Sequence, residues 1–428
     1  MTDITARPDA GSHSALHLPD FRSYLAGNIA STIGGQMQSV AIGWELYERT
    51  RSTLALGLVG LVQVLPIIAL GLPAGHWVDR YDRRHILMLA LAASAAASLA
   101  LAAVSRAHGP ILVIYAALLL SGVARTFSGA ARGALLPQIV PAEHLARAVT
   151  WSSGGWQLAA VIGPALGGAV IGWTHSAAPA YLLAAAGALA WVALLARTES
   201  RPYVPTVGAM TLASLALGLR FVRRTNIILA TITLDLFAVL LGGATTLLPV
   251  FARDILRVGP TGLGWLLAAQ SLGAVAMAAV LARRPPMRRA GRALLWAVAG
   301  FGAATIAFGL SRSFALSMVA LLAAGALDMI SVIVRSTLVP LLTPNEMRGR
   351  VSAINGMFIG TSNELGGFES GALAALIGPV ASVVAGGIGT VIVVIAVARI
   401  WPSLWQLGAL HDVRPVEKVE MDAARPRP

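Results

Sequence analysis

The sequence Arg132-Gly-Ala-Leu-Leu-Pro137 returns later in the chain as Arg335-Ser-Thr-Leu-Val-Pro340. Each copy is followed, at the same spacing, by a proline, a glutamate and an arginine: Pro141, Glu143 and Arg147 in the first copy, and Pro344, Glu346 and Arg350 in the second. Matching positions are 203 residues apart, and two glycines, Gly163 and Gly168, recur at this offset as Gly366 and Gly371. Both copies lie between long apolar segments. The repeat therefore predicts a membrane protein made of two similar halves, an arrangement typical of transporters.

The composition of the chain is also that of a membrane protein. Hydrophobic residues make up 57% of the 428 residues and charged residues 12%, and the mean hydropathy is +0.74, outside the range of soluble domains. The chain has no cysteine, which excludes disulfide bonds and a cysteine nucleophile. It shows no cluster of metal-ligating residues in its apolar segments and no phosphate-binding glycine loop followed by lysine. We therefore expect no metal, no cofactor and no enzymatic activity.

Twelve apolar segments are long enough to cross a bilayer. Each crossing needs about 20 mostly apolar residues, because no backbone polar group can be left unpaired in lipid. Six segments fall in each half, so both halves have the same orientation and are related by an axis along the membrane normal. We predict an all-α membrane protein with spans at 24–46, 54–75, 85–104, 111–131, 148–172, 180–196, 226–250, 262–283, 293–311, 314–337, 351–378 and 379–400.

Five parts follow from these spans. They are a cytoplasmic tail at 1–20, a first six-helix half at 21–196, a linker at 197–225, a second six-helix half at 226–401 and a second cytoplasmic tail at 402–428. Within the linker, the stretch from Thr211 to Arg224 is apolar on one side and basic at its end. This pattern predicts a short amphipathic helix on the surface of the inner leaflet.

The positive charges indicate the orientation. With both termini inside, about 25 of the 32 Lys and Arg residues fall in cytoplasmic segments, as the positive-inside rule requires. The net charge of +13 is therefore a signal of membrane orientation. It does not predict nucleic-acid binding, because the charges are scattered over separate loops.

The loop between the second and third spans carries a recognisable motif. It reads Gly75-His-Trp-Val-Asp79-Arg80-Tyr-Asp82-Arg83-Arg84. Gly75 permits two helix ends to approach closely, and the arginines hold the loop at an anionic membrane surface. This spacing resembles the loop signature of the major facilitator superfamily, although Asp82 replaces the usual glycine. The corresponding loop of the second half, residues 283–292, lacks the aspartate.

Two further motifs resemble the same superfamily. Arg125 precedes Gly129 by four residues in the fourth span, which is similar to the buried-arginine motif of the superfamily. The fifth span contains Gly163-Pro164-Ala-Leu-Gly167-Gly168, which resembles a helix-bending motif of exporters and proton antiporters. Small residues allow close helix contact and the proline interrupts the hydrogen-bond ladder. The alternative is that this cluster serves helix packing alone.

Two other stretches resemble one branch of the superfamily, which holds the bacterial enterobactin exporter and macrolide efflux proteins. These stretches are residues 21–27 and 342–356. The resemblance extends over about residues 20–400 and implies a multi-pass protein of the bacterial inner membrane. It also implies export of a small organic molecule by alternating access, with the first, fourth, seventh and tenth spans lining a central cavity.

Ionisable residues within spans are candidate functional groups, because an unpaired charge in lipid costs several kcal/mol. Asp235 and Asp328 each lie about nine residues from the inner end of a span, about 13 Å deep. With Arg125 they form a possible trio around the cavity, and Glu364 is a further candidate. Either aspartate could carry the coupling proton, hold a permanent partner such as Arg125, or touch the substrate. The candidate polar groups of the cavity are Asn28, Gln36, Gln38, Asn355 and Asn363.

We therefore expect a monomeric, proton-coupled exporter of a drug-like compound or siderophore. Two alternatives remain open at this point. One is an uptake carrier of the same fold, and the other is a membrane sensor or scaffold that no longer transports.

Overall fold

The computed structural model describes residues 14–198, 212–285 and 287–409. The parts of the predicted tails at 1–13 and 410–428, and of the linker at 199–211, lie outside the described residues. After a short turn, η1 (Ser14–His17), the first half consists of six long helices. They are α1 (Pro19–Thr50), α2 (Thr53–Arg80), α3 (Arg83–Ala107), α4 (Ile111–Ile139), α5 (Ala142–Thr174) and α6 (Ala178–Ala196).

The second half repeats this order with one interrupted helix. A linker helix, α7 (Leu212–Arg224), precedes it, as the amphipathic pattern predicts. The seventh span is built from four pieces: α8 (Asn226–Leu241), η2 (Ala244–Leu247), α9 (Leu248–Val250) and a π-helical turn, η3 (Phe251–Ile255). Five long helices and one short one follow: α10 (Gly259–Ala282), α11 (Ala290–Leu310), α12 (Phe314–Leu342), α13 (Arg348–Ile377), α14 (Pro379–Ile400) and α15 (Pro402–Gln406).

Eleven of the predicted spans each coincide with one of these long helices, and the seventh, at 226–250, coincides with the interrupted one. The all-α fold is confirmed. Within the described residues, ten helices are long and apolar enough to cross a membrane by composition. The two predicted spans that fall short of this criterion are α1 and α13. The middle turns of both helices carry several polar residues, and those of α13 also carry Glu364. These two helices are therefore the natural places to look for a polar site.

Very short connections set consecutive helices antiparallel. Arg51 ends α1 in the left-handed region, with φ 52°, and Ser52 then caps α2 by accepting a hydrogen bond from the Ala55 N–H at 3.2 Å. At the other end of α2, Asp82 caps α3 by accepting a hydrogen bond from the Arg84 N–H at 2.8 Å. Such caps satisfy backbone donors that the helix itself leaves free.

The internal repeat is retained in three dimensions. α4 and α12 begin and end at residues exactly one repeat apart, Ile111 with Phe314 and Ile139 with Leu342. α3 and α11 end at matching residues, as do α5 and α13. The seventh span breaks the match at Gly243, where a Cβ atom would lie 2.9 Å from the carbonyl oxygen of Gly366 on α13.

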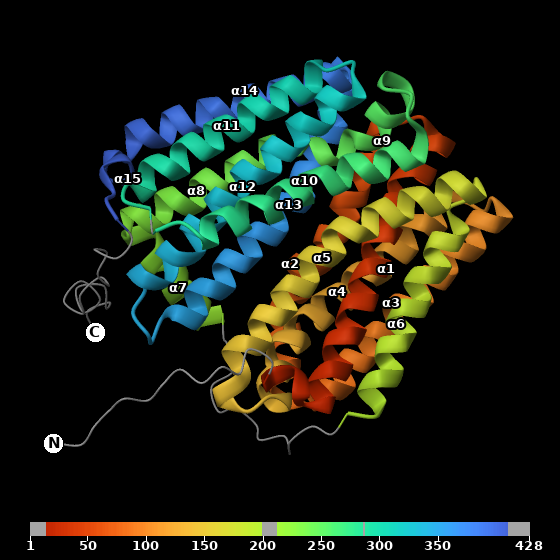
Figure 1. The fold of residues 1–428 in the computed structure, drawn as a ribbon, viewed down its shortest axis with the longest axis horizontal. Helices are drawn as coiled ribbons and strands as arrows, with labels where there is room; N and C mark the ends of the chain where they lie inside the picture. The colour runs from red at the N-terminus through yellow and green to blue at the C-terminus, as the bar shows by residue number, and fades with distance from the viewer. Residues whose placement is uncertain (1–13, 199–211, 286, 410–428) are drawn as a thin grey trace.

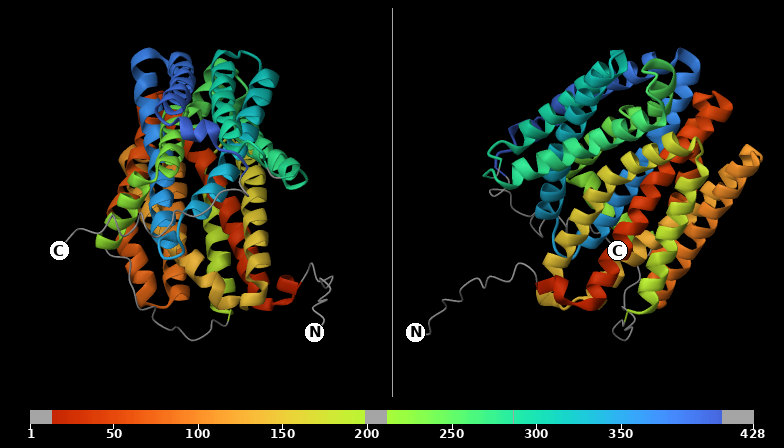
Figure 2. Two further views of the ribbon diagram at one scale, coloured as in Figure 1. Left: turned by 90° about the vertical axis from the view of Figure 1, so that its left-hand side faces the viewer. Right: turned by 45° about the vertical axis from the view of Figure 1, so that its right-hand side comes forward.

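The two halves form separate bundles that meet at one end (Figures 1 and 2). α2 packs against α13, and α5 packs against α10, across the interface between them. The bundles touch where α1 ends beside α9, and they diverge toward the end where α1 begins and α7 lies. α7 packs on the second half: a Cβ at Gly218 would lie 2.7 Å from Cδ1 of Ile354.

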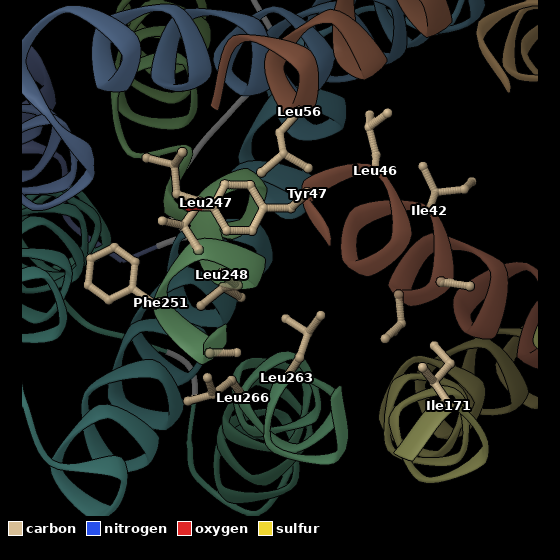
Figure 3. Close-up of a cluster of buried hydrophobic side chains, with 14 of the residues drawn as sticks. Ile42, Leu46, Tyr47, Leu56, Ile171, Leu247, Leu248, Phe251, Leu263 and Leu266 are labelled. Carbon is tan, nitrogen blue, oxygen red and sulfur yellow. The ribbon is translucent and has the colours of Figure 1, made fainter. Parts of the chain in front are cut away.

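A hydrophobic cluster joins the halves at their meeting end (Figure 3). It combines side chains of α1, α2 and α5 with side chains of the seventh and eighth spans. Its largest members are fully or almost fully buried. We call this cluster the outer seal, and the opposite end of the molecule the inner end, after the orientation predicted from the positive charges. The outer seal includes Ile42, Leu46, Tyr47, Leu56, Ile171, Leu247, Leu248, Phe251, Leu263 and Leu266.

Candidate functional site

A cavity of about 550 Å³ lies between the two halves. Most of its lining comes from α1, α2 and α4 of the first half, with contributions from the seventh span, α10 and α13 of the second. Hydroxyl and amide groups dominate its polar part: Ser31, Thr32, Gln36, Gln38, Ser39, Gln63, Ser94, Ser121, Ser128, Thr245, Thr246 and Asn363. Apolar side chains and the ring of Trp156 on α5 complete the wall. A mixed lining of this size suits a small organic molecule.

An ion pair crosses the cavity from one half to the other. Nη2 of Arg125 on α4 lies 2.5 Å from Oε1 of Glu364 on α13. Both residues line the cavity. The Arg125 side chain is 49% exposed and that of Glu364 is 18% exposed, so the pair is open to cavity water. Arg125 is 14 residues from the end of α4 at Ile139, and Glu364 is 16 residues from the start of α13 at Arg348, so both lie near the middle of their helices.

The structure brings together some of the predicted polar residues and separates others. Gln36, Gln38 and Asn363 line the cavity. Gln38 also accepts a hydrogen bond from Ser98 on α3 at 2.6 Å. One of its hydrogen-bonding groups therefore connects α1 to α3. Asn28 is buried, and neither it nor Asn355 is among the lining residues.

The predicted trio of Asp235, Asp328 and Arg125 is not assembled in this structure. Asp235 on α8 instead forms a buried ion pair with Arg335 on α12, inside the second half. Asp328 interacts electrostatically with Arg335 and Asp235. Arg125 has Glu364 as its partner, so the two acids predicted to face it sit around a different arginine. The reason is helix rotation: the faces of α8 and α12 that carry these acids point into their own bundle.

Arg132 lines the cavity and was not among the predicted site residues, although it opens the internal repeat. Its guanidinium lies over the ring of Trp191 on α6, 4.6 Å from the ring centroid. Tyr24 on α1 packs edge-on against the same ring, with centroids 5.7 Å apart. Three helices therefore fix the position of this arginine.

The glycines of the exporter-type motif form close helix contacts on both sides of α5. A Cβ at Gly163 would lie 2.5 Å from Cβ of Gln36, and one at Gly167 would lie 2.9 Å from Cα of Met37, both on α1. On the opposite side, a Cβ at Gly168 would lie 2.8 Å from Cα of Gly264 on α10. Pro164 is also buried in this contact region. The motif thus joins α5 to its own half and to the other half.

A second set of polar contacts links the halves at the outer seal. The Tyr47 hydroxyl donates to Asp254 at 2.5 Å, and Arg51 lies 3.1 Å from the same carboxylate. Arg253 lies 3.3 Å from Glu48. We call these five residues the outer lock. In the sequence they look like ordinary polar residues near the ends of two spans, and only the fold shows that they face one another.

The loop motif between α2 and α3 stabilises the inner end of the first half. Arg83 donates to the carbonyl of Ala134 on α4 at 3.0 Å, and Arg84 donates to that of Ala196 on α6 at 2.7 Å. Arg80 is exposed, and Asp79 is partly buried. A Cβ at Gly75 would find no atom within 4 Å. The close approach expected at Gly75 is therefore not made in this conformation, because the inner ends of the two halves are apart.

No group of three or more His, Cys, Asp or Glu side chains that could hold a metal ion occurs in the described ranges.

Comparison with known proteins agrees with this architecture. The family described as transmembrane secretion effector matches residues 10–421. The enterobactin exporter EntS of Shigella boydii serotype 18 is 28% identical over 380 residues, covering 88% of this chain and 90% of that protein. EntS of Escherichia coli O157:H7 matches to the same extent.

Solved structures share the fold at low sequence identity. A peptide transporter of the POT family superimposes with a TM-score of 0.73 at 11% identity, over 91% of this chain and 95% of that one. A bacterial homologue of the lysosomal transporter Spinster, inward-facing and occupied, gives 0.66 at 15% identity, over 95% and 98%. The chain, with its duplicated six-helix halves, therefore belongs to the transmembrane secretion effector family of major facilitator transporters.

Proposed function

We propose that this protein exports a small organic molecule from the cytoplasm in exchange for protons. The observation that carries the proposal is the Arg125–Glu364 ion pair, which joins the two halves across a cavity of molecular size. The family match and the likeness to enterobactin exporters support export as the direction and a siderophore or drug-like compound as the cargo.

The arrangement of the halves supports alternating access. The outer seal and the outer lock hold the halves together at one end, while the bundles diverge at the other. We infer that the divergent end faces the cytoplasm, since the basic loops 80–84 and 283–292 lie there. The conformation is then inward-facing, with the cavity ready to receive a cytoplasmic molecule. Export requires the halves to rock so that the outer contacts open. We further infer that the protein works as a monomer in the bilayer, with both termini cytoplasmic.

Glu364 is the acid best placed to couple this motion to protons. It is partly exposed to the cavity, and its carboxylate faces a cation of the opposite half. A proton on Glu364 removes the negative charge that holds Arg125, which weakens the contact between α4 and α13. Because the pair is partly open to water, its loss changes the free-energy difference between the two conformations by about 1 kcal/mol, which is enough for a single proton to shift their balance.

Asp235 and Asp328 remain alternative coupling acids. Asp235 is buried and already neutralised by Arg335 within its own half. This geometry favours a structural role, because the pair need not change partners when the halves rock. We assign Asp235 and Arg335 the role of an internal clasp of the second half.

The test is efflux from cells of an efflux-deficient host that express the protein, screened against toxic compounds with and without a protonophore. We expect expression to lower accumulation of at least one compound, and the protonophore to restore it. Glu364→Gln should abolish the effect of the protonophore, whereas Glu143→Gln, an exposed acid of α5, should not.

The alternatives give different outcomes in the same screen. An uptake carrier would raise the accumulation of the compound. A non-transporting sensor would leave every accumulation unchanged in both the parent protein and Glu364→Gln. Either result would contradict the proposal.

A further inference from the structure

The cavity carries an unbalanced positive charge. Among the described residues that line it, three are ionisable: Arg125, Arg132 and Glu364. Arg125 and Glu364 neutralise each other at 2.5 Å. In the part of the chain that the structure describes, Arg132 interacts with Tyr24 and Trp191 and with no carboxylate.

The guanidinium of Arg132 has a fixed position, but not all of its N–H groups have hydrogen-bond partners. Its face rests on the Trp191 ring, which is fully buried. Its Nε is buried and has no hydrogen-bond partner in the part of the chain that the structure describes. A buried donor without a partner destabilises the folded protein, and more so when it belongs to a charged group. Because Nε is enclosed, a ligand in the cavity would accept from the two Nη groups of Arg132 instead.

The arginine at the matching position of the second half has a different environment. Arg335 is the repeat partner of Arg132, and its helix, α12, matches α4 residue for residue at both ends. Arg335 is paired with Asp235 and does not line the cavity. The fold can therefore supply a counter-ion at this position, and in the second half it does. In the first half the arginine faces the cavity without one.

The geometry points to an organic anion as the transported molecule, with its anionic group bound to Arg132. A carboxylate or similar group matches the planar fork of a guanidinium through two parallel hydrogen bonds. Trp156 also lines the cavity, so its ring offers a flat apolar surface to the body of the molecule. This inference names the substrate class of the export proposed above and rests on it.

The test compares two probes that differ only in charge, 1-naphthoate and 1-naphthamide, by calorimetric titration into the purified full-length protein in lipid nanodiscs. We expect naphthoate to bind about tenfold more tightly than the amide, equivalent to about 1.4 kcal/mol. Arg132→Gln should lose this preference, with the affinity for the amide changed less than about twofold. Arg312→Gln removes the same charge from an exposed loop and should keep the preference. Equal affinities of the parent protein for the two probes, or a preference that survives in Arg132→Gln, would overturn the inference.

A second variant covers the case in which Arg132→Gln does not fold. Arg132→Lys keeps the charge but not the planar fork, so we expect it to weaken naphthoate binding and leave amide binding unchanged. If Arg132→Lys binds naphthoate as tightly as the parent protein does, the inference that the carboxylate forms two parallel hydrogen bonds with the guanidinium is wrong.

Proteoliposomes separate this inference from the export proposal. Movement of naphthamide but not naphthoate in a pH gradient would overturn the anion assignment while export stands. Binding of naphthoate through Arg132, with no movement of either probe, would support the anion site and contradict export.

Discussion

Gly57 of α2 and Gly371 of α13 lie so close across the two halves that a Cβ atom on Gly371 would be 2.6 Å from Cα of Gly57. The second contact between the halves repeats this relationship. There, a Cβ on Gly168 of α5 would lie 2.8 Å from Cα of Gly264 on α10. Both contacts are glycine against glycine because only glycine lets two backbones approach this closely. Gly168 and Gly371 are related by the repeat that relates Arg132 to Arg335, whereas their partners Gly264 and Gly57 lie about one helical turn out of that register.

Alanine at Gly371 should therefore push the outer ends apart. The atoms that the new methyl group meets are backbone atoms of Gly57 and Thr53, which cannot move without moving α2. We expect Gly371→Ala to shift the population from the inward-facing toward the outward-facing form. The measurement is the distance between spin labels introduced at His175 and Arg312, on outer loops of the two halves, by pulsed electron resonance.

The matched control for this experiment is Gly349→Ala, since a Cβ at Gly349 meets no atom within 4 Å. It should leave the label distances unchanged. Identical distance distributions for Gly371→Ala and the parent protein would show that the glycine contact does not hold the outer ends together.

Removing one charge of the Asp235–Arg335 clasp should destabilise the second half. Asp235→Asn leaves the buried Arg335 without its ion-pair partner, with Asp328 as the remaining acid near it, and breaking a buried pair costs up to about 3–5 kcal/mol. We expect Asp235→Asn to unfold in detergent at a lower temperature than the parent protein. The double variant Asp235→Asn with Arg335→Gln should recover most of this loss.

The same variants distinguish a clasp from a coupling acid. If the double variant is stable and still moves its substrate in response to a pH gradient, Asp235 is structural. Loss of gradient-driven transport in a double variant that remains folded would instead restore Asp235 as the coupling acid, in place of Glu364.

Weakening the outer lock should change the conformational balance by a small factor. Asp254→Asn removes the charge that faces Arg51, and the two side chains are 40% and 56% exposed. Exposed ion pairs contribute about 0–1 kcal/mol, so we expect a severalfold rise at most in the outward-facing fraction. The difference between Asp254→Asn and the parent protein should shrink at high salt, where exposed charges are screened. A difference that does not depend on salt would assign the effect to the Tyr47 hydrogen bond.

The absence of cysteine in the chain allows the orientation to be tested directly. A single cysteine at Trp173, at the exposed end of α5, should react with a membrane-impermeant maleimide added to intact cells. A single cysteine at Arg288, in the loop between α10 and α11, should react only after the membrane is permeabilised. The reverse pattern would invert the proposed topology and with it the direction of transport.

Part of the candidate site could be predicted from the sequence. Gln36, Gln38 and Asn363 stand out as polar residues in otherwise apolar spans, and all three line the cavity. Glu364 stands out for the same reason. Arg132 does not stand out in the sequence, because the positive-inside rule already predicts arginines near the inner ends of spans. Its role becomes visible only when the cavity and the partner of Arg335 are both known.

The sequence by itself determined the twelve helices, their division into two halves and the symmetry between them. This follows because the bilayer sets the length of each span and a duplication leaves its register in the chain. The tertiary structure alone decided which acid meets which base. Arg125 reaches Glu364 across 239 residues of sequence, and Asp235 turns to Arg335 instead of the cavity. Such pairings depend on the rotation and packing of each helix against its neighbours, which the pattern of apolar residues does not fix when a span is apolar on nearly every side.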